Sequence, residues 1–177
     1  MTRKVIVHIA ASADGFIARK DGNLDWLTSR PHPPGFYGMA EWVKTIDLEI
    51  MGRKTYEEGL RLGGTFDKKD RTMVFSRSPR PANASPNVQF VNEPVRSLVD
   101  RLRSKPGKNI WLMGGGELIA DFLDANAIDE FFIGIVPVFI GEGIPLIAPR
   151  HRHVQLKLVS AEPFEDGLVM VHYEVAR

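Results

Sequence analysis

The chain has 177 residues, of which 44% are hydrophobic and 25% charged, as in an ordinary globular protein with a sizeable core. Its 23 basic and 22 acidic side chains nearly cancel, which argues against a nucleic-acid partner, because such partners select strongly basic surfaces. The absence of cysteine excludes disulfides, thiolate catalysis and cysteine-based zinc sites, and no apolar stretch approaches the roughly eighteen residues of a membrane span.

The N-terminal stretch MTRKVIVHIA is basic and then apolar, but its apolar part is short. We interpret residues 5–10 as a buried strand rather than a signal peptide, and we expect a cytoplasmic protein. Residues 12–26 contain two Asp-Gly pairs and are expected to form a loop, and the proline-rich residues 30–35 are expected to be neither helix nor central strand. With no internal repeat or linker-like stretch, we expect one domain over residues 1–177.

Helical spacing appears next, because Met39, Trp42, Val43 and Ile46 recur at the positions of one helix face. The elements that follow are predicted, in chain order, as a strand over 48–51, a helix over 53–60 and strands over 72–76 and 88–91.

The second half of the chain repeats this alternation. Pro94 is expected to be the first residue of a helix with an apolar stripe of Val95, Leu98, Val99 and Leu102. The remaining elements are predicted as a strand over 110–113, a helix with its stripe over 118–123, a strand region over 131–140 limited by Pro137, and a hairpin of 154–162 and 168–175 joined across Glu-Asp-Gly. This pattern predicts an α/β fold with a mostly parallel sheet and antiparallel strands at one side.

The end of the second predicted strand carries residues suited to an anion. Ligands of a parallel sheet bind beyond the carboxyl ends of its strands. Gly52, Arg53, Lys54 and Thr55 lie there at a helix start, where free amides, the helix dipole and two cations suit phosphate. A turn with solvated basic residues is an equally good interpretation.

Two further strand ends have the same character. Ser76 and Arg77 offer a hydroxyl and a guanidinium suited to a phosphate monoester, with an exposed turn as the alternative. The motif MGGGEL places three glycines at a helix start, where a pyrophosphate or a ring could approach bare backbone, or where the chain is simply a flexible turn. Together the three ends outline a polyphosphate-bearing cofactor lying across the sheet edge.

The cofactor motifs of the dihydrofolate reductase fold resemble three stretches of this chain, in this order and spacing: IMGRKTYE (50–57), VFSRS (74–78) and MGGGEL (113–118). The subgroup related to the reductase domain of riboflavin biosynthesis, the RibD C-terminal domain, resembles three more: HIAASADGFIA (8–18), GNLDW (22–26) and VPVFIGEGIPLI (136–147). The similarity covers nearly the whole chain. It implies the dihydrofolate reductase-like, three-layer α/β/α architecture, with the mostly parallel sheet in the middle and the C-terminal antiparallel hairpin at its side.

The resemblance also implies NADPH as the cofactor and a set of residues around it. The pyrophosphate would be held, and the 2′-phosphate approached, by Gly52, Arg53, Lys54 and Thr55. The adenosine 2′-phosphate would be flanked by Ser76 and Arg77, which favours NADPH over NADH. The chain would pass under the cofactor at Gly114, Gly115 and Gly116, with a cis peptide between the first two. The next helix would open against the pyrophosphate with Glu117, Leu118 and Ile119, and the nicotinamide carboxamide would meet the backbone of Ala10 and Ala11.

The substrate side departs from the family pattern. True dihydrofolate reductases place a carboxylate on the first helix, a few residues after the loop tryptophan, where it binds the pterin. Here Trp26 is followed by no acid until Glu41. The catalytic candidates are therefore Asp25 and Glu41 near the pocket mouth, together with Asp14, and Trp26 as a pocket wall. Each also has a structural interpretation: Asp14 as a turn former, Asp25 as a turn cap, Glu41 as a solvated helix residue and Trp26 as core.

These observations lead to the hypothesis of an NADPH-dependent reductase that transfers hydride to a small heterocyclic substrate, pterin- or folate-like or riboflavin-precursor-like. Water or Asp25 would supply the proton. The alternatives are a folate reductase, a 5-amino-6-(5-phosphoribosylamino)uracil reductase of the riboflavin pathway, and a non-catalytic NADP(H)- or nucleotide-binding protein. The missing helix acid weighs against the first, and the absence of a deaminase domain with cysteine ligands weighs against the second.

The expected partners are few. We expect a small-molecule substrate, no nucleic acid and no membrane, and a homodimer, because relatives of this fold subgroup are often dimers. No metal site is predicted, because His151 and His153 have no third ligand nearby, and His8 and His172 lie in apparent strands where packing or an interface explains them better.

Overall fold

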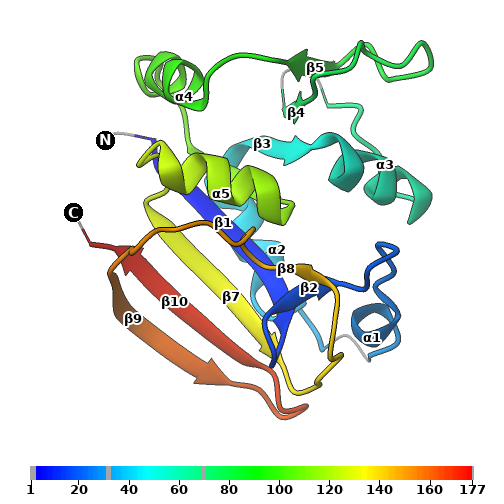
Figure 1. The fold of residues 1–177 in the computed structure, drawn as a ribbon, viewed down its shortest axis with the longest axis vertical. Helices are drawn as coiled ribbons and strands as arrows, with labels where there is room; N and C mark the ends of the chain where they lie inside the picture. Colours follow the sequence, from blue (N-terminus) through cyan, green and yellow to red (C-terminus); the bar gives the residue numbers. More distant parts are fainter. Residues whose placement is uncertain (1–2, 31–32, 69–70, 177) are drawn as a thin grey trace.

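An eight-stranded sheet forms the centre of the computed structural model, which describes residues 3–30, 33–68 and 71–176 (Figure 1). The strand order is β5-β4-β3-β6-β1-β7-β10-β9. The first five neighbouring pairs are parallel, and β10 is antiparallel to both β7 and β9, so the predicted mostly parallel sheet with a C-terminal hairpin is confirmed. In chain order the strands are β1 (Val5–Ser12), β3 (Ile46–Gly52), β4 (Thr72–Phe75), β5 (Val88–Val91), β6 (Asn109–Gly114), β7 (Glu130–Val136), β9 (Leu156–Pro163) and β10 (Val169–Val175).

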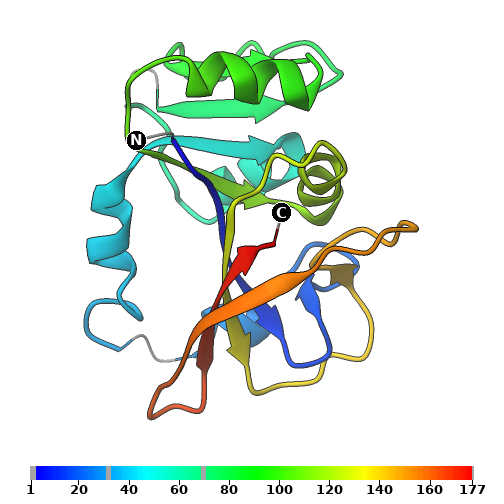
Figure 2. The same cartoon turned by 90° about the vertical axis from the view of Figure 1, so that its left-hand side faces the viewer.

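Helices cover both faces of this sheet, which gives the expected three layers. On one face α4 (Val95–Arg103) and α5 (Gly116–Asp124) pack on alternate strand residues, such as Val5 and Val7 of β1. On the other face lie α3 (Arg53–Arg61) and the short α2 (Met39–Trp42). Figure 2 shows α2 and α5 on opposite sides of the sheet. No helix in the described ranges combines the length and the apolar character needed to cross a membrane.

The apolar stripe predicted for α4 forms the buried face of this helix. Leu98, Val99 and Leu102 are all buried in the main core, because their spacing places them on one face of the helix. Pro94 precedes the helix as its N-cap residue instead of being its first residue, and its carbonyl accepts the Leu98 N–H at 3.1 Å. The proline thus still marks the helix start, and the helix begins one residue later than predicted, at Val95.

The loop predicted over residues 12–26 differs in part from the structure. The stretch 12–26, predicted as loop, contains β2 (Phe16–Ala18), which pairs with β8 (Ile144–Pro145), and the start of α1 (Asp25–Thr28). These elements are too short to show a periodic pattern. Of the proline-rich residues 30–35, those in the structure are outside helices and strands, while 31 and 32 lie outside the described residues.

The helix predicted from Met39 to Ile46 is wrong at its end. The helical part stops at Trp42, a 3₁₀ turn (Val43–Thr45) follows, and Ile46 is the first residue of β3. Ile46 shares its apolar character with Leu48 and Ile50, and this period of two assigns it to the strand.

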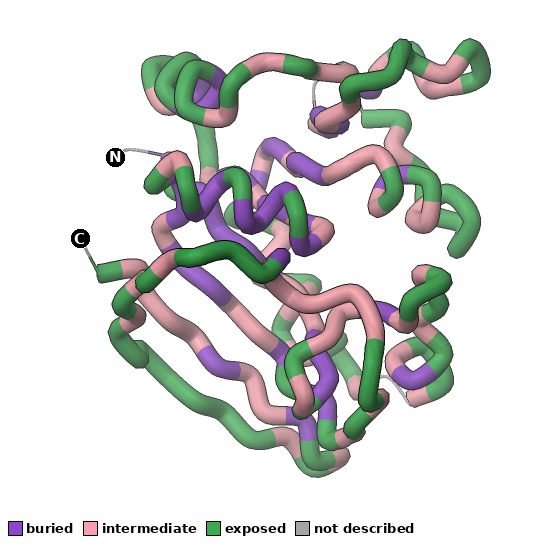
Figure 3. Tube along the Cα trace, viewed as in Figure 1, coloured by how far each residue is buried: buried purple, intermediate pink, exposed green. Residues whose placement is uncertain are grey.

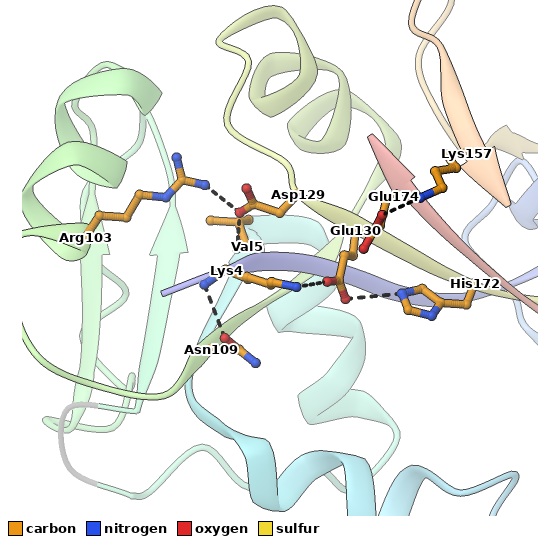
Figure 4. Close-up of polar contacts among 9 residues, drawn as sticks. All are labelled: Lys4, Val5, Arg103, Asn109, Asp129, Glu130, Lys157, His172 and Glu174. Atoms are coloured by element: carbon orange, nitrogen blue, oxygen red, sulfur yellow. Dashed lines mark hydrogen bonds and ion pairs between the residues drawn. The ribbon is translucent and has the colours of Figure 1, made fainter. Parts of the chain in front are cut away.

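A group of ion pairs joins the amino-terminal ends of β1 and β7 (Figure 4). Asp129 accepts a hydrogen bond from Arg103 Nη2 at 2.5 Å. The buried Glu130 pairs with Lys4 and lies 3.2 Å from Nε2 of His172, and its hydrogen bond raises the pKa of Lys4. Because parallel sheets bind ligands at the opposite, carboxyl ends of their strands, we interpret this group as structural.

Strand β9 forms one edge of the sheet and is exposed along nearly its whole length (Figure 3). Its large apolar side chains Leu158 and Val159 are 55% and 47% exposed. An edge strand with exposed apolar residues is a surface on which another chain can pair.

Candidate active site

Three strands end side by side at one edge of the sheet. Gly52 of β3 pairs with Phe75 of β4, and its neighbour Met51 pairs with Gly114 of β6. The motifs that follow these strands therefore meet, as their position after parallel strands predicts. Arg53 shows this directly, because its Nη1 donates to Ser76 Oγ at 3.4 Å across the β3–β4 boundary.

Cations are available at this edge. Arg53 also donates to the Pro79 carbonyl at 2.9 Å and pairs with Glu57 at 2.8 Å. Lys54 and Arg77 are exposed, and within residues 3–30, 33–68 and 71–176 neither forms an ion pair. Unpaired cations beside the start of a helix are the usual environment of a bound phosphate.

The glycine turn lies against this cation-bearing edge. The peptide between Gly114 and Gly115 is cis, as the resemblance implies, and Gly114 has φ of +101°, a conformation that favours glycine. A Cβ atom on Gly115 would lie 3.6 Å from Thr55 Oγ1 and 3.8 Å from Ile17 Cδ1. The turn is therefore bordered by the start of α3 on one side and by β2 on the other.

Gly116 has a different explanation from the expected one. A Cβ atom on Gly116 would lie 2.3 Å from the carbonyl oxygen of Pro145, so the required space is taken by protein backbone and not by a cofactor. The segment Gly143–Ala148, which we name the strap, crosses here. Its amides at Leu146 and Ala148 donate to the carbonyls of Gly15 and Gly116 at 2.9 and 3.1 Å.

In the sequence, most of the strap is part of the family motif VPVFIGEGIPLI (136–147), and no separate role was predicted for it. Its glycine and the proline between apolar residues could have indicated a tightly packed segment. Gly143 supports this, because a Cβ atom there would lie 2.2 Å from the Ala18 carbonyl oxygen of β2.

The start of α5 can meet a ligand only through its backbone. Leu118 and Ile119 are buried in the main core, and the Ile119 N–H donates to the Gly115 carbonyl at 3.0 Å. Glu117 is exposed and pairs with Arg150 at 2.9 Å. An anion at the start of α5 would therefore be bound by the first backbone amides of the helix and by the positive end of its dipole.

The acidic candidates are engaged on the surface. Asp25 is 53% exposed and pairs with Arg19 Nε at 2.7 Å, and this hydrogen bond lowers its pKa. Glu41 pairs with Lys44 at 2.6 Å, three residues on along the chain. Both carboxylates are thus bound to cations.

Asp14 has a structural task. Its carboxylate accepts the backbone N–H groups of Ile140 and Gly141 at 3.1 and 2.7 Å, and the Ser12 hydroxyl donates to it at 2.6 Å. These bonds lower the pKa of Asp14, the Ser12 bond most strongly. Asp14 therefore ties the first loop to the chain that follows β7.

Trp26 packs near the carboxyl end of β1. Trp26 is 7% exposed and packs with Val136 and Leu168, and Ala10 belongs to the same apolar cluster. The Trp26 indole N–H has no hydrogen-bond partner among the described residues. Ala11 is buried, so it could meet a ligand only through its backbone.

The four histidines in the described ranges form no metal-binding group. In the part of the chain that the structure describes, no three His, Asp or Glu side chains are grouped so that they could hold a metal ion. His8 and His172 are packed, His8 on Trp42 at 4.5 Å between ring centroids and His172 on Phe132 at 3.9 Å. His151 and His153 are exposed.

The chain is similar to known proteins over its whole length. The uncharacterised protein YwjB of Bacillus subtilis (strain 168) is 40% identical over 174 residues, 98% of each chain. A Shewanella sp. PV-4 protein, provisionally named a riboflavin biosynthesis protein, has a crystal structure that matches with a TM-score of 0.83 and 30% identity over 100% of both chains. Dihydrofolate reductase from Enterococcus faecalis, solved with NADP(H), matches with a TM-score of 0.70 and 18% identity over 100% of both chains, which shows the fold alone.

The family model of the RibD C-terminal domain matches residues 3–170. The fold and the family are both shared with reductases. Sheet order, cis-glycine turn and family match agree, and the chain therefore belongs to the RibD C-terminal domain family, with the fold of dihydrofolate reductase.

Proposed function

We propose that this protein is an NADPH-dependent reductase of a small heterocyclic substrate of the pterin or pyrimidine kind. The observation that carries the proposal is the meeting of three anion-compatible strand ends, marked by the contact of Arg53 with Ser76 beside the glycine turn. Fold alone would not suffice, because one fold hosts many activities. The cations and the bare backbone at this edge supply the independent support.

NADPH fits the residues present. Lys54 and Arg77 would neutralise phosphate charges, and the Ser76 hydroxyl would exchange its bond to the Ser78 carbonyl for one to a phosphate oxygen. The first amides of α3 and α5 would face the pyrophosphate, and Gly115 would leave room for it. When bound, NADPH supplies the hydride, and the protein supplies binding and orientation.

The proton has no obvious carboxylic source. Asp25 is ionised and held by Arg19, and Glu41 is held by Lys44, so neither is poised to donate a proton. We therefore assign the proton to water. The same pairing supports the second candidate, a protein that binds NADP(H) without catalysis.

Turnover separates these two functions. The purified protein is expected to oxidise NADPH, followed by absorbance at 340 nm, with at least one member of a panel of pterins, riboflavin precursors and quinone-like acceptors. NADPH binding without oxidation by any of them would favour the non-catalytic protein, and absence of binding would contradict both functions.

Arg77→Ala is expected to weaken NADPH binding about tenfold or more while changing NADH binding less than about twofold, because a guanidinium–phosphate contact is lost only with the 2′-phosphate. Dissociation constants from fluorescence titration provide the measurement. Arg80→Ala is the matched control, since Arg80 is engaged with the carbonyls of Ala84 and Ser85. Equal weakening of both cofactors would remove Arg77 from the 2′-phosphate site.

A homodimer formed through the β9 edge is our proposal for the oligomeric state. Light scattering is expected to give twice the 19.8 kDa mass of the chain. Leu158→Lys is expected to give monomers, because it places a charge at the centre of the exposed apolar edge. Leu62→Lys, at a 50% exposed leucine just beyond α3, is the control and is expected to leave the dimer intact. A wild-type monomer would contradict the proposal.

A further inference from the structure

The β9–β10 turn is fastened to the chain between α1 and α2 by one carboxylate. Asp166 Oδ2 accepts the Tyr37 hydroxyl at 2.5 Å and Arg30 Nη2 at 2.9 Å. The same Arg30 nitrogen also donates to the Asp166 carbonyl at 2.8 Å, and Oδ1 accepts the Leu168 N–H at 3.2 Å. We name Arg30, Tyr37 and Asp166 the latch.

The segment that the latch holds has a disfavoured backbone. Four successive residues, Gly35, Phe36, Tyr37 and Gly38, have φ of 76°, 49°, 55° and 80°. Left-handed backbone is unfavourable for residues that carry a Cβ atom, and such a stretch persists where its surroundings hold it. Tyr37 provides the hold, through its hydroxyl on Asp166 and its ring edge-on to Phe164, 5.0 Å between centroids.

The helix before this segment also depends on tertiary contacts. α1 has four residues and no side-chain cap at Leu24, so it is far too short to be stable alone. Its one buried residue, Trp26, packs on Val136 and Leu168, and Leu168 follows the latched turn directly. Two contacts therefore hold α1 on the β9–β10 hairpin: the bond of Arg30 to Asp166 and the packing of Trp26 on Leu168.

This fixed segment packs at the carboxyl end of β1. Trp26 and Tyr37 share their apolar cluster with Ala10 of β1. β1 pairs with β6, and the carboxyl end of β6 carries the glycine turn. Residues 25–30 and 35–38, which we name the wall, therefore lie at the same sheet edge as the proposed cofactor site.

We propose that Asp166, from the distant β9–β10 turn, is a positioning residue that holds the wall in place beside the acceptor. The part about the acceptor rests on the proposed reductase function. The holding contact stands on the hydrogen bonds and the left-handed backbone alone. The Tyr37 hydroxyl, followed by Arg30, lowers the pKa of Asp166 to about 2, so the carboxylate keeps its charge at ordinary pH.

Hydrogen exchange measured by mass spectrometry tests the holding contact. Asp166→Asn is expected to speed exchange of the wall amides about tenfold, the effect of losing a charged hydrogen bond, with the amides of β1 and β6 unchanged. Tyr37→Phe, the milder variant, is expected to act in the same direction. Glu165→Gln, at the exposed neighbouring carboxylate, is expected to match the wild type. Unchanged wall exchange in both latch variants, or faster exchange throughout the sheet, would overturn the proposal.

Kinetics test the positioning role. In Asp166→Asn the dissociation constant of NADPH is expected to stay within about twofold, while KM for an acceptor found in the panel rises about tenfold at nearly constant kcat. An unchanged KM together with a loosened wall would overturn the positioning role. If the wild-type protein reduces no acceptor, the proposed function fails, and the exchange data still decide whether Asp166 holds the wall.

Discussion

Gly116→Ala is expected to lower the free energy of unfolding by about 3 kcal/mol. The added methyl would lie 2.3 Å from the Pro145 carbonyl oxygen, and that oxygen belongs to backbone, which cannot rotate away as a side chain can. The strap must therefore move from α5. It would lose the bond from the Ala148 N–H to the Gly116 carbonyl and strain the bond from Leu146 to Gly15.

Urea unfolding followed by circular dichroism measures this loss, and Gly115→Ala is its matched control. A Cβ atom on Gly115 would make ordinary contacts at 3.6 and 3.8 Å, so this variant is expected to keep near-normal stability while weakening NADPH binding. Equal stability of the two variants would contradict the role of the strap. Normal NADPH binding by Gly115→Ala would mean that the turn is not a cofactor contact.

Lowering the pH from 7 to 4 is expected to remove about 3 kcal/mol of stability through His8 alone. Burial lowers the pKa of His8 from 6.5 to about 4, and Nδ1 has no hydrogen-bond partner among the described residues. The unfolded chain takes up the proton below about pH 6.5, whereas the folded protein takes it up only near pH 4. The contribution is thus complete above pH 6.5 and falls as the pH drops through this window.

His8→Phe tests this effect, because a phenyl ring can keep the stacking on Trp42 and the tilted contact with Phe132 without taking up a proton. The difference in urea stability between pH 7 and pH 4 is expected to shrink by about 3 kcal/mol in this variant. His151→Gln, at an exposed histidine, is expected to leave the difference unchanged. A His8→Phe profile that matches the wild type would show that the acid sensitivity arises elsewhere.

The edge that we propose for the cofactor was predictable because strand order decides it. Gly52 and Gly114 end buried parallel strands and Ser76 follows one, and the carboxyl ends of such strands share one edge. The hydrophobic patterns that marked the strands therefore also placed the motifs. Even the stripe of α4 follows from spacing, since Leu98 and Leu102 are one turn apart.

Contacts between short, distant segments were not predictable in this way. β2 and β8 have three and two residues, too few to show a period, and they are joined from opposite ends of the chain. Nothing near Asp166 in the sequence indicates Arg30 or Tyr37 as its partners. By contrast, the pairing of Glu41 with Lys44 has a local signal, a spacing of three residues within a predicted helix that became α2 and the 3₁₀ turn after it, and could have been predicted.

The position of β1 in the sheet has a consequence for how the chain folds. β1 precedes every other strand, yet it lies in the middle, where Val5 pairs with Ile110 and His8 with Phe132. During synthesis β1 can therefore pair with neither β6 nor β7 until more than a hundred further residues have been made. Its apolar edges stay unpaired for that time, and the high sequence separation of these central pairings makes folding slow. The centre of the sheet is therefore completed only after β6 and β7 have been made.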